Sequence, residues 1–148
     1  LIKWPNDILV DNNKLCGILT ELKAEQDATS FIILGIGINA NTKTSLLPRY
    51  STSISDETGR SVSKVELTKE ILKNLERHYE IFKKGRFKNI IEEWKELSVT
   101  LGKRVKLADK TQRIEGQAID LDESGALVVR LDNGFNEKIL AGDVILVR

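Results

Sequence analysis

The sequence has almost none of the side chains from which disulfides and most metal sites are built. Its 148 residues include one cysteine, Cys16, and one histidine, His78. A single cysteine excludes an internal disulfide and a multi-cysteine zinc site, and a single histidine leaves little material for a histidine-based metal site or a serine–histidine–aspartate triad. Scarce cysteine is also typical of a reducing compartment, so we expect a cytoplasmic protein.

Long apolar runs and a surplus of either charge are absent too. No stretch approaches the roughly 18 consecutive apolar residues of a membrane span, and the first residues lack the pattern of a secretory signal. The net charge is only +1, and basic residues are spread evenly along the chain, whereas nucleic-acid binding usually needs a concentrated basic surface. We expect neither a membrane nor a nucleic acid as a partner.

Methionine is missing altogether, although translation starts with it, and the chain begins at Leu1. The enzyme that removes the first methionine prefers a small residue in the next position, which leucine is not. We therefore expect this chain to be a piece of a longer protein. Its length, with 41% hydrophobic and 30% charged residues, is enough for one full domain or two small ones.

Hydrophobic patterning predicts a small sheet at the start of the chain. Two short β-favouring runs, residues 1–4 and 8–10, precede the Asp11-Asn12-Asn13 turn, and another run, 15–22, follows it, which predicts a β-hairpin. The nearly unbroken apolar run Phe31–Ile38 is typical of a strand covered on both faces, and we place it centrally in the sheet. The polar residues 39–60 then form a long connection.

Two amphipathic helices are predicted next. A capping-box pattern at Ser63 begins the first helix, and apolar residues recur at spacings of three and four as far as Lys83. Gly85 ends this helix, and a similar pattern over 87–97 predicts a second helix that packs beside the first. Within these helices we interpret His78 as a packed or boundary residue rather than an acid or base.

The last third of the chain predicts a small β-barrel. Its connections, 122–125 and 132–134, carry the glycine and asparagine that tight hairpin turns require. Five brief β-favouring runs are separated by such connections: 104–107, 114–121, 126–131, 135–140 and 144–147. The fold class is therefore α+β, with a partial mixed or antiparallel sheet and two helices over residues 1–100, and the barrel over 101–148.

Three motifs near the start concentrate the chemistry. They are Lys3-Trp4-Pro5-Asn6-Asp7, Lys14-Leu15-Cys16-Gly17-Ile18-Leu19 with Glu21 close behind, and Gly35-Ile36-Gly37-Ile38-Asn39. In this order they resemble the biotin protein ligases, in which a two-helix segment and an SH3-like barrel also follow. The resemblance spans the whole chain.

The resemblance implies a two-step reaction. Biotin and Mg-ATP form biotinoyl-AMP, whose acyl group is then attacked by a lysine of a biotin carboxyl carrier protein. Joining a carboxylate to an α-phosphate needs a fixed cation, and the resemblance gives this place to Lys14. The attacking amine must lose a proton, and Asp7 is the implied acceptor. Biotin and ATP are thus the implied substrates and Mg²⁺ the implied metal ion.

The remaining motif residues are implied to bind substrate. Asn6 offers a donor and an acceptor near the phosphates or their Mg²⁺, and it is the one candidate metal ligand. The glycines let backbone amides approach a ligand closely, Asn39 lies against the adenylate, and Lys3 adds positive potential. Cys16 stands where alanine is expected, and we interpret it as a small buried residue. The implied substrate-binding residues are Lys3, Trp4, Asn6, Gly17, Gly35, Gly37 and Asn39.

Each motif also has a plainer interpretation. Pro-Asn-Asp is common turn chemistry, and Lys14 alone is more often a solvated hairpin lysine. The Gly-x-Gly pattern lacks the third glycine and the following helix of a dinucleotide-binding site, so a Rossmann fold is rejected. The basic cluster over 83–88 falls at a helix end, where cations complement the helix dipole.

One feature that the resemblance implies is missing. The Gly/Arg-rich loop of the family, of the G-R-G-R-x-G kind, does not occur in this sequence. Without it the mixed anhydride has little protection from water, so we do not expect catalysis by this chain alone. Exposed sheet surface would favour a homodimer or aggregation. The alternatives are a non-catalytic protein-binding module, and a ligase for lipoate or another carboxylic acid, although the KWPND motif favours biotin.

Overall fold

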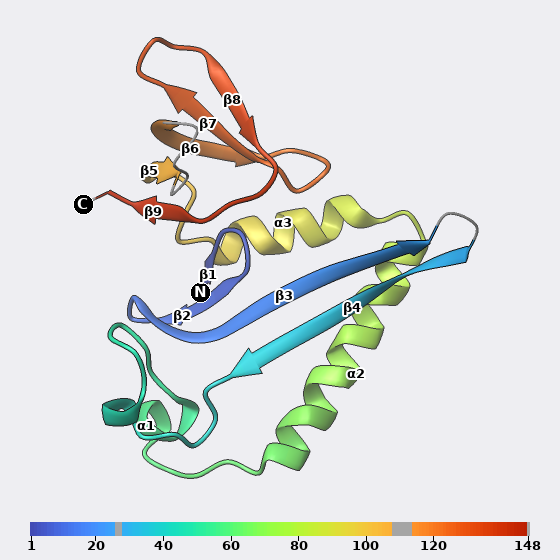
Figure 1. Ribbon diagram of the computed structural model, residues 1–148, viewed down its shortest axis with the longest axis vertical. Coiled ribbons are helices and arrows are strands. Elements are labelled where there is room, and N and C mark those ends of the chain that lie inside the picture. The colour runs from blue at the N-terminus through green and yellow to red at the C-terminus, as the bar shows by residue number, and fades with distance from the viewer. Residues whose placement is uncertain (26–27, 108–113, 148) are drawn as a thin grey trace. The chain divides into compact units, whose positions relative to one another are not determined.

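The computed structural model describes residues 1–25, 28–107 and 114–147 (Figure 1). The chain divides into two compact units. The hairpin unit is Asn6–Lys64, and the helix–sheet unit joins Leu1–Pro5 to Val65–Arg148. No helix in the described part of the chain is long and apolar enough to cross a membrane.

The hairpin unit contains three successive antiparallel strands. They are β2 (Asp7–Val10), β3 (Asn13–Glu25) and β4 (Ala28–Ile38). Asp11 and Asn12, at the turn between β2 and β3, have positive φ angles of 45° and 67°. Aspartate and asparagine tolerate this left-handed region better than most residues, which is why this dipeptide supports a tight hairpin turn. The predicted hairpin is confirmed.

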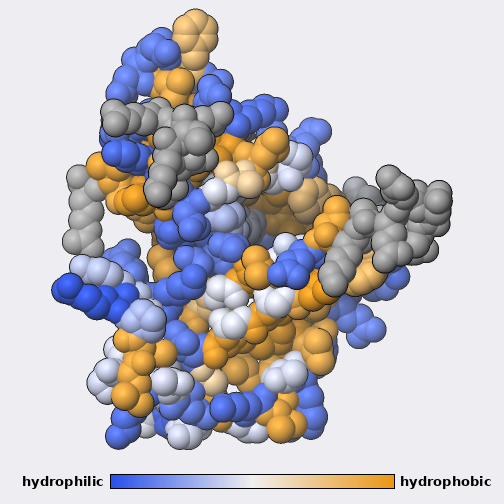
Figure 2. Space-filling model, in the orientation of Figure 1, coloured by the Kyte–Doolittle hydropathy of each residue, from blue (hydrophilic) through white to orange (hydrophobic). Residues whose placement is uncertain are grey.

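The prediction that Phe31–Ile38 is central and covered on both faces is wrong for the chain described. Strand β4 is the last in its sheet order, and Ile32 is 66% exposed. Apolar surface remains visible on the face drawn in Figure 2. An apolar run on both faces of a strand demands cover on both faces, and none of the described residues supplies it. The exposed apolar residues of β3 and β4 are Leu19, Leu22, Phe31, Ile32, Ile33, Leu34 and Ile36.

The predicted long connection after β4 contains two short helices. The 3-10 helix η1 is Thr44–Leu46, and helix α1 is Ile54–Thr58. The Ser53 hydroxyl caps α1 by accepting from the Asp56 amide at 3.3 Å. Helices of one turn are too short to produce an apolar period, so the sequence pattern did not indicate them.

Both predicted long helices are confirmed in the helix–sheet unit. They are α2 (Lys64–Lys83) and α3 (Phe87–Leu97), with Gly85 between them at a φ of 70°. The His78 imidazole lies 2.8 Å from the Asn74 carbonyl oxygen and 3.2 Å from the Glu93 carboxylate. It thus joins the two helices, which agrees with its interpretation as a boundary residue.

The five predicted C-terminal strands are also present, as an antiparallel sheet in the order β8-β7-β6-β5-β9. Its core is formed by side chains such as Leu127 and Val129, which are fully buried, and Ile91 of α3 joins them. Strand β1 (Ile2–Lys3) belongs to this unit, where Ile2 bridges Ser98. The sheet strands are β5 (Arg104–Leu107), β6 (Glu115–Leu121), β7 (Leu127–Leu131), β8 (Asn136–Ile139) and β9 (Val144–Leu146).

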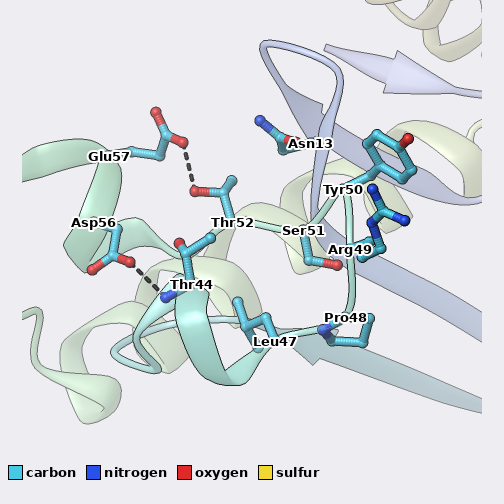
Figure 3. Close-up of a pocket in the computed structure, with 10 residues that line it drawn as sticks. All are labelled: Asn13, Thr44, Leu47, Pro48, Arg49, Tyr50, Ser51, Thr52, Asp56 and Glu57. Atoms are coloured by element: carbon cyan, nitrogen blue, oxygen red, sulfur yellow. Dashed lines mark hydrogen bonds between the residues drawn. The ribbon is translucent and has the colours of Figure 1, made fainter.

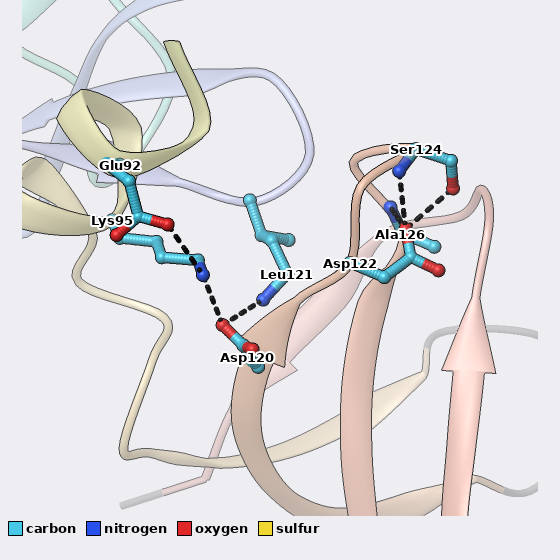
Figure 4. Close-up of polar contacts among 7 residues, drawn as sticks. All are labelled: Glu92, Lys95, Asp120, Leu121, Asp122, Ser124 and Ala126. Atoms are coloured by element: carbon cyan, nitrogen blue, oxygen red, sulfur yellow. Dashed lines mark hydrogen bonds and ion pairs between the residues drawn. The ribbon is translucent and has the colours of Figure 1, made fainter. Parts of the chain in front are cut away.

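Asp122 organises the turn between β6 and β7 (Figure 4). Its carboxylate accepts from the Ser124 amide at 2.8 Å, the Ser124 hydroxyl at 2.6 Å and the Ala126 amide at 3.1 Å. The Ser124 hydroxyl, followed by Lys138, holds the pKa of this carboxyl well below its ordinary value. Nearby, Lys95 of α3 pairs with Asp120 of β6 at 2.7 Å, so an ion pair links the helix to the sheet.

Gly116 on β6 should be intolerant of any side chain. A Cβ there would overlap the Arg130 carbonyl oxygen and approach Val129 Cγ1 to 2.9 Å. Because the first obstacle is backbone, Gly116→Ala should destabilise the protein by roughly 3 kcal/mol, which urea unfolding measures. The exposed neighbour Gln117 is the control, since Gln117→Ala should change stability by about 0.5 kcal/mol or less. Equal urea midpoints for the two variants would contradict the predicted packing.

Candidate active site

An ion pair on the β2–β3 hairpin is the centre of the candidate site. Lys14 Nζ lies 2.6 Å from Asp7 Oδ1. The Asp7 side chain is only 16% exposed, whereas that of Lys14 is 47% exposed. A half-buried carboxylate is thus held beside a cation that still faces solvent, and the cation is available to an anionic ligand.

A β-bulge brings the two charged groups onto one face of the hairpin. Asp7 pairs with Gly17 and Ile8 with Cys16, but Leu9 pairs with Lys14, so Leu15 is an extra residue on β3. In a regular strand, positions 14 and 17 would point to opposite faces because they are an odd number apart. The bulge changes this alternation, and the Lys14 side chain lies on the face that holds Asp7.

The backbone of Lys14 is fixed by a distant segment. Its amide donates to the Tyr50 carbonyl oxygen at 2.8 Å, and its carbonyl oxygen accepts from the Thr52 amide at 3.0 Å. The Asn39 side-chain amide donates to the same carbonyl oxygen at 3.3 Å. Lys14 is therefore held between β2 and the loop before α1, which limits where its ammonium can lie.

Asn6 is fixed equally firmly to the opposite strand. Its side-chain amide donates to the Ile18 carbonyl oxygen at 2.6 Å, and its backbone oxygen accepts from the Ile18 amide at 2.9 Å. In the described part of the chain no group of three or more histidine, cysteine, aspartate or glutamate residues is placed to hold a metal ion. Asp7, the carboxylate next to Asn6, is engaged by Lys14, so these residues do not fit a preformed Mg²⁺ site.

Lys14 of the ion pair lines an open cavity of about 430 Å³, a volume typical of small-molecule sites. A second cavity of about 510 Å³ shares the segment Pro48–Ser51 with it and extends to Asp56 and Glu57 (Figure 3). The first cavity is lined by Lys14, Leu15, Cys16, Gly17, Gly37, Asn39, Pro48, Arg49, Tyr50 and Ser51.

Sequence reasoning missed Arg49 and Tyr50. The guanidinium of Arg49 lies 5.8 Å from the centre of the Tyr50 ring, and both residues line the cavity beside Lys14. Neither belongs to a motif, because they enter the site only through the bridge between Lys14 and Ser51. The one available signal was the polar connection after β4, since long loops often carry binding residues.

Cys16 is a small buried residue, as expected from the sequence. The residue is 4% exposed. Burial raises the pKa of its thiol, an effect that Lys14 partly offsets and Asp7 reinforces. A buried, protonated thiol is a poor nucleophile, so the candidate chemistry belongs to the ion pair.

The structure places four of the nine predicted site residues on the wall of the cavity: Lys14, Gly17, Gly37 and Asn39. Asn6, Asp7 and Gly35 belong to the same hairpin unit but do not line the cavity. Lys3 and Trp4 belong to the other unit, where the Trp4 indole joins the apolar core and donates to the Gly125 carbonyl oxygen at 3.2 Å.

Two family models match this chain. Residues 1–39 match the biotin/lipoate A/B protein ligase family, and residues 100–147 match the biotin protein ligase C-terminal domain. The matched residues 1–39 include both Lys14 and Asp7.

Individual proteins are similar over nearly the whole chain. The bifunctional ligase/repressor BirA of Bacillus subtilis is 32% identical over 98% of this chain and 46% of its own length. The biotin–[acetyl-CoA-carboxylase] ligase of Mycobacterium tuberculosis is 28% identical over 99% of this chain and 53% of its own. The chain thus spans about half the length of these relatives.

A solved structure is similar too. The biotin protein ligase from Aquifex aeolicus in complex with biotin and ATP has a TM-score of 0.81 at 28% identity, covering 99% of this chain and 61% of that one.

Proposed function

This chain belongs to the biotin protein ligase family, and we propose that the protein containing it activates biotin with ATP and transfers the biotinoyl group to a lysine of a biotin carboxyl carrier protein. The observation that carries this proposal is Lys14, which lines the cavity and pairs with the Asp7 carboxylate. One cation and one carboxylate at 2.6 Å supply what the two steps need.

In the first step the biotin carboxylate attacks the α-phosphorus of ATP, and pyrophosphate leaves. Two anions must approach each other, so a fixed positive charge lowers the barrier if it lies where negative charge develops. Lys14 supplies this charge from a backbone that is held on two sides. Arg49, on the same cavity wall, adds a second cation that can hold phosphate oxygens in a bidentate manner.

In the second step the carrier lysine attacks the acyl carbon of biotinoyl-AMP, and AMP leaves. The attacking amine is protonated in water and must lose that proton to become a nucleophile. Asp7 is the carboxylate of the candidate pair, and it accepts that proton once Lys14 has turned from it to the adenylate. The described residues hold no group of three or more histidine, cysteine, aspartate or glutamate side chains placed to bind a metal ion, so an Mg²⁺ ion that arrived with ATP would be held mainly by its phosphates and by water.

Lipoate is the competing substrate, because the family matched by residues 1–39 includes lipoate ligases by its description. The match of residues 100–147 to the biotin protein ligase C-terminal domain favours biotin.

Calorimetric titration can decide between these substrates. We expect the whole protein in which this chain occurs to bind a non-hydrolysable biotinoyl-AMP analogue about 100-fold more tightly than the matching lipoyl analogue. Tighter binding of the lipoyl compound would make it a lipoate ligase. If the folded protein binds neither compound, the non-catalytic module becomes the better description.

A further inference from the structure

We propose that Gly17 is a positioning residue, whose missing side chain leaves the space through which Lys14 reaches Asp7. The inference rests on the proposed function and deepens it. A Cβ on Gly17 would lie 3.1 Å from both Cε and Nζ of Lys14, and 3.7 Å from Asp7 Oδ1. The end of the Lys14 side chain therefore lies closer to this position than an ordinary van der Waals contact, and an added methyl group would push it aside.

The other two motif glycines do not share this property. A Cβ on Gly35 would come no closer than 3.7 Å to its nearest neighbour, the Leu19 carbonyl oxygen, and a Cβ on Gly37 would lie 3.7 Å from the Gly17 carbonyl oxygen. Both distances are ordinary van der Waals contacts. Close approach of a ligand to the backbone is the expected role of all three glycines, but at Gly17 the space is already filled by a catalytic side chain.

Strand register explains why the clash falls at this position. Asp7 and Gly17 are directly opposed, so a side chain at 17 would lie beside the Asp7 carboxylate on the same face. The bulge at Leu15 places Lys14, which pairs with Leu9, on that face and next to Gly17 along β3. Lys14 therefore reaches Asp7 diagonally, and the end of its side chain lies beside Gly17.

The added methyl group of Gly17→Ala meets only the flexible end of a lysine. That end can move aside at little cost to folding, and the shift lengthens and weakens its contact with Asp7. We therefore expect a melting temperature within about 2 °C of that of the unsubstituted protein. We also expect a weaker ion pair. A slower formation of biotinoyl-AMP at an unchanged melting temperature separates a positioning role from a merely structural one.

The first measurement does not depend on enzyme activity. In the whole protein, Lys14 should react with acetic anhydride faster in Gly17→Ala than in the unsubstituted protein, and about as fast as in Asp7→Asn, as measured by peptide mass spectrometry. An ammonium in an ion pair must leave its carboxylate before it reacts. Thr20→Ala, an exposed change on the same strand, should leave the rate unchanged. A Lys14 rate in Gly17→Ala equal to that of the unsubstituted protein would overturn the proposal.

The second measurement is a double-mutant cycle on biotinoyl-AMP formation. Gly17→Ala should lower kcat by about 10- to 100-fold, with a smaller change in KM for biotin, because the methyl group displaces the Lys14 ammonium itself, whereas Asp7→Asn leaves the space beside Gly17 open to it. In a Lys14→Ala background it should have no further effect, because the atoms that the methyl group meets are gone. An additive loss would instead mean that Gly17 contacts the ligand directly, and would refute the positioning role. If acetylation changes as expected but no form of the protein makes biotinoyl-AMP, the ligase proposal fails and the positioning of Lys14 stands.

Discussion

Replacing Lys14 with alanine should lower the rate of biotinoyl-AMP formation by about 100- to 1,000-fold, the usual effect of removing one preorganised charge-stabilising group. The loss has two sources. The cation that offsets the approach of carboxylate and phosphate disappears, and the Asp7 carboxylate, only 16% exposed, loses its contact with that cation beside an anionic substrate. Pyrophosphate release in a single turnover of the whole protein measures this rate.

The effect of the remaining Asp7 charge can be separated from the effect of losing the Lys14 cation. The double variant Lys14→Ala with Asp7→Asn also removes the negative charge of Asp7, so it should form biotinoyl-AMP faster than Lys14→Ala alone. Lys43→Ala is the matched control, because Lys43 is an exposed lysine of the same unit that does not line the cavity. Folding should survive, since a partly exposed ion pair contributes about 1 kcal/mol or less. Equal rates for Lys14→Ala and Lys43→Ala would exclude Lys14 from the chemistry.

The elements with a strong hydrophobic period were predictable from the sequence. Helices α2 and α3 follow from apolar residues every three or four positions, and the β2–β3 hairpin follows from the Asp11-Asn12 turn. In each case the information is local. The burial of β4 was not predictable in this way. An apolar run indicates that a strand needs other residues packed on both faces, but it does not indicate which residues pack there.

The candidate site was predictable in its residues but not in its geometry. Motif resemblance pointed to Lys14 and Asp7, and the structure places them 2.6 Å apart. The bulge that puts them on one face depends on pairing between two strands, and nothing in the local sequence around Leu15 marks it. Arg49 and Tyr50 were missed for a related reason, since a parallel bridge between distant residues brings them to the cavity.

The ion pair also imposes an order on the two steps. Asp7 holds Lys14 in the absence of ligand, so an anion that binds Lys14 must first compete with Asp7. Once the adenylate has taken Lys14, the Asp7 carboxylate is available to the incoming amine. The protein would thus release its proton acceptor only after an acyl group is ready for transfer, and each residue acts mainly in one step.

Asp7→Asn should therefore separate the two half-reactions. Transfer of biotin to the carrier lysine should fall by about 100- to 10,000-fold, the range for loss of a positioned proton acceptor. Formation of biotinoyl-AMP should fall far less, because Lys14 keeps its charge and its backbone contacts to the loop before α1. Quenched-flow measurement of the adenylate and of biotinylated carrier gives both rates from one experiment.

A nucleophile other than the carrier lysine tests why biotin transfer slows in Asp7→Asn. Hydroxylamine is uncharged near neutral pH and attacks an acyl adenylate without losing a proton first, so it should capture the biotinoyl group at similar rates from Asp7→Asn and from the unsubstituted protein. Asp11→Asn is the control, since Asp11 is an exposed carboxylate in the adjoining turn with a positive φ that asparagine also tolerates. If hydroxylamine capture falls as far as transfer to the carrier lysine, Asp7 acts by holding the adenylate and not by accepting the proton.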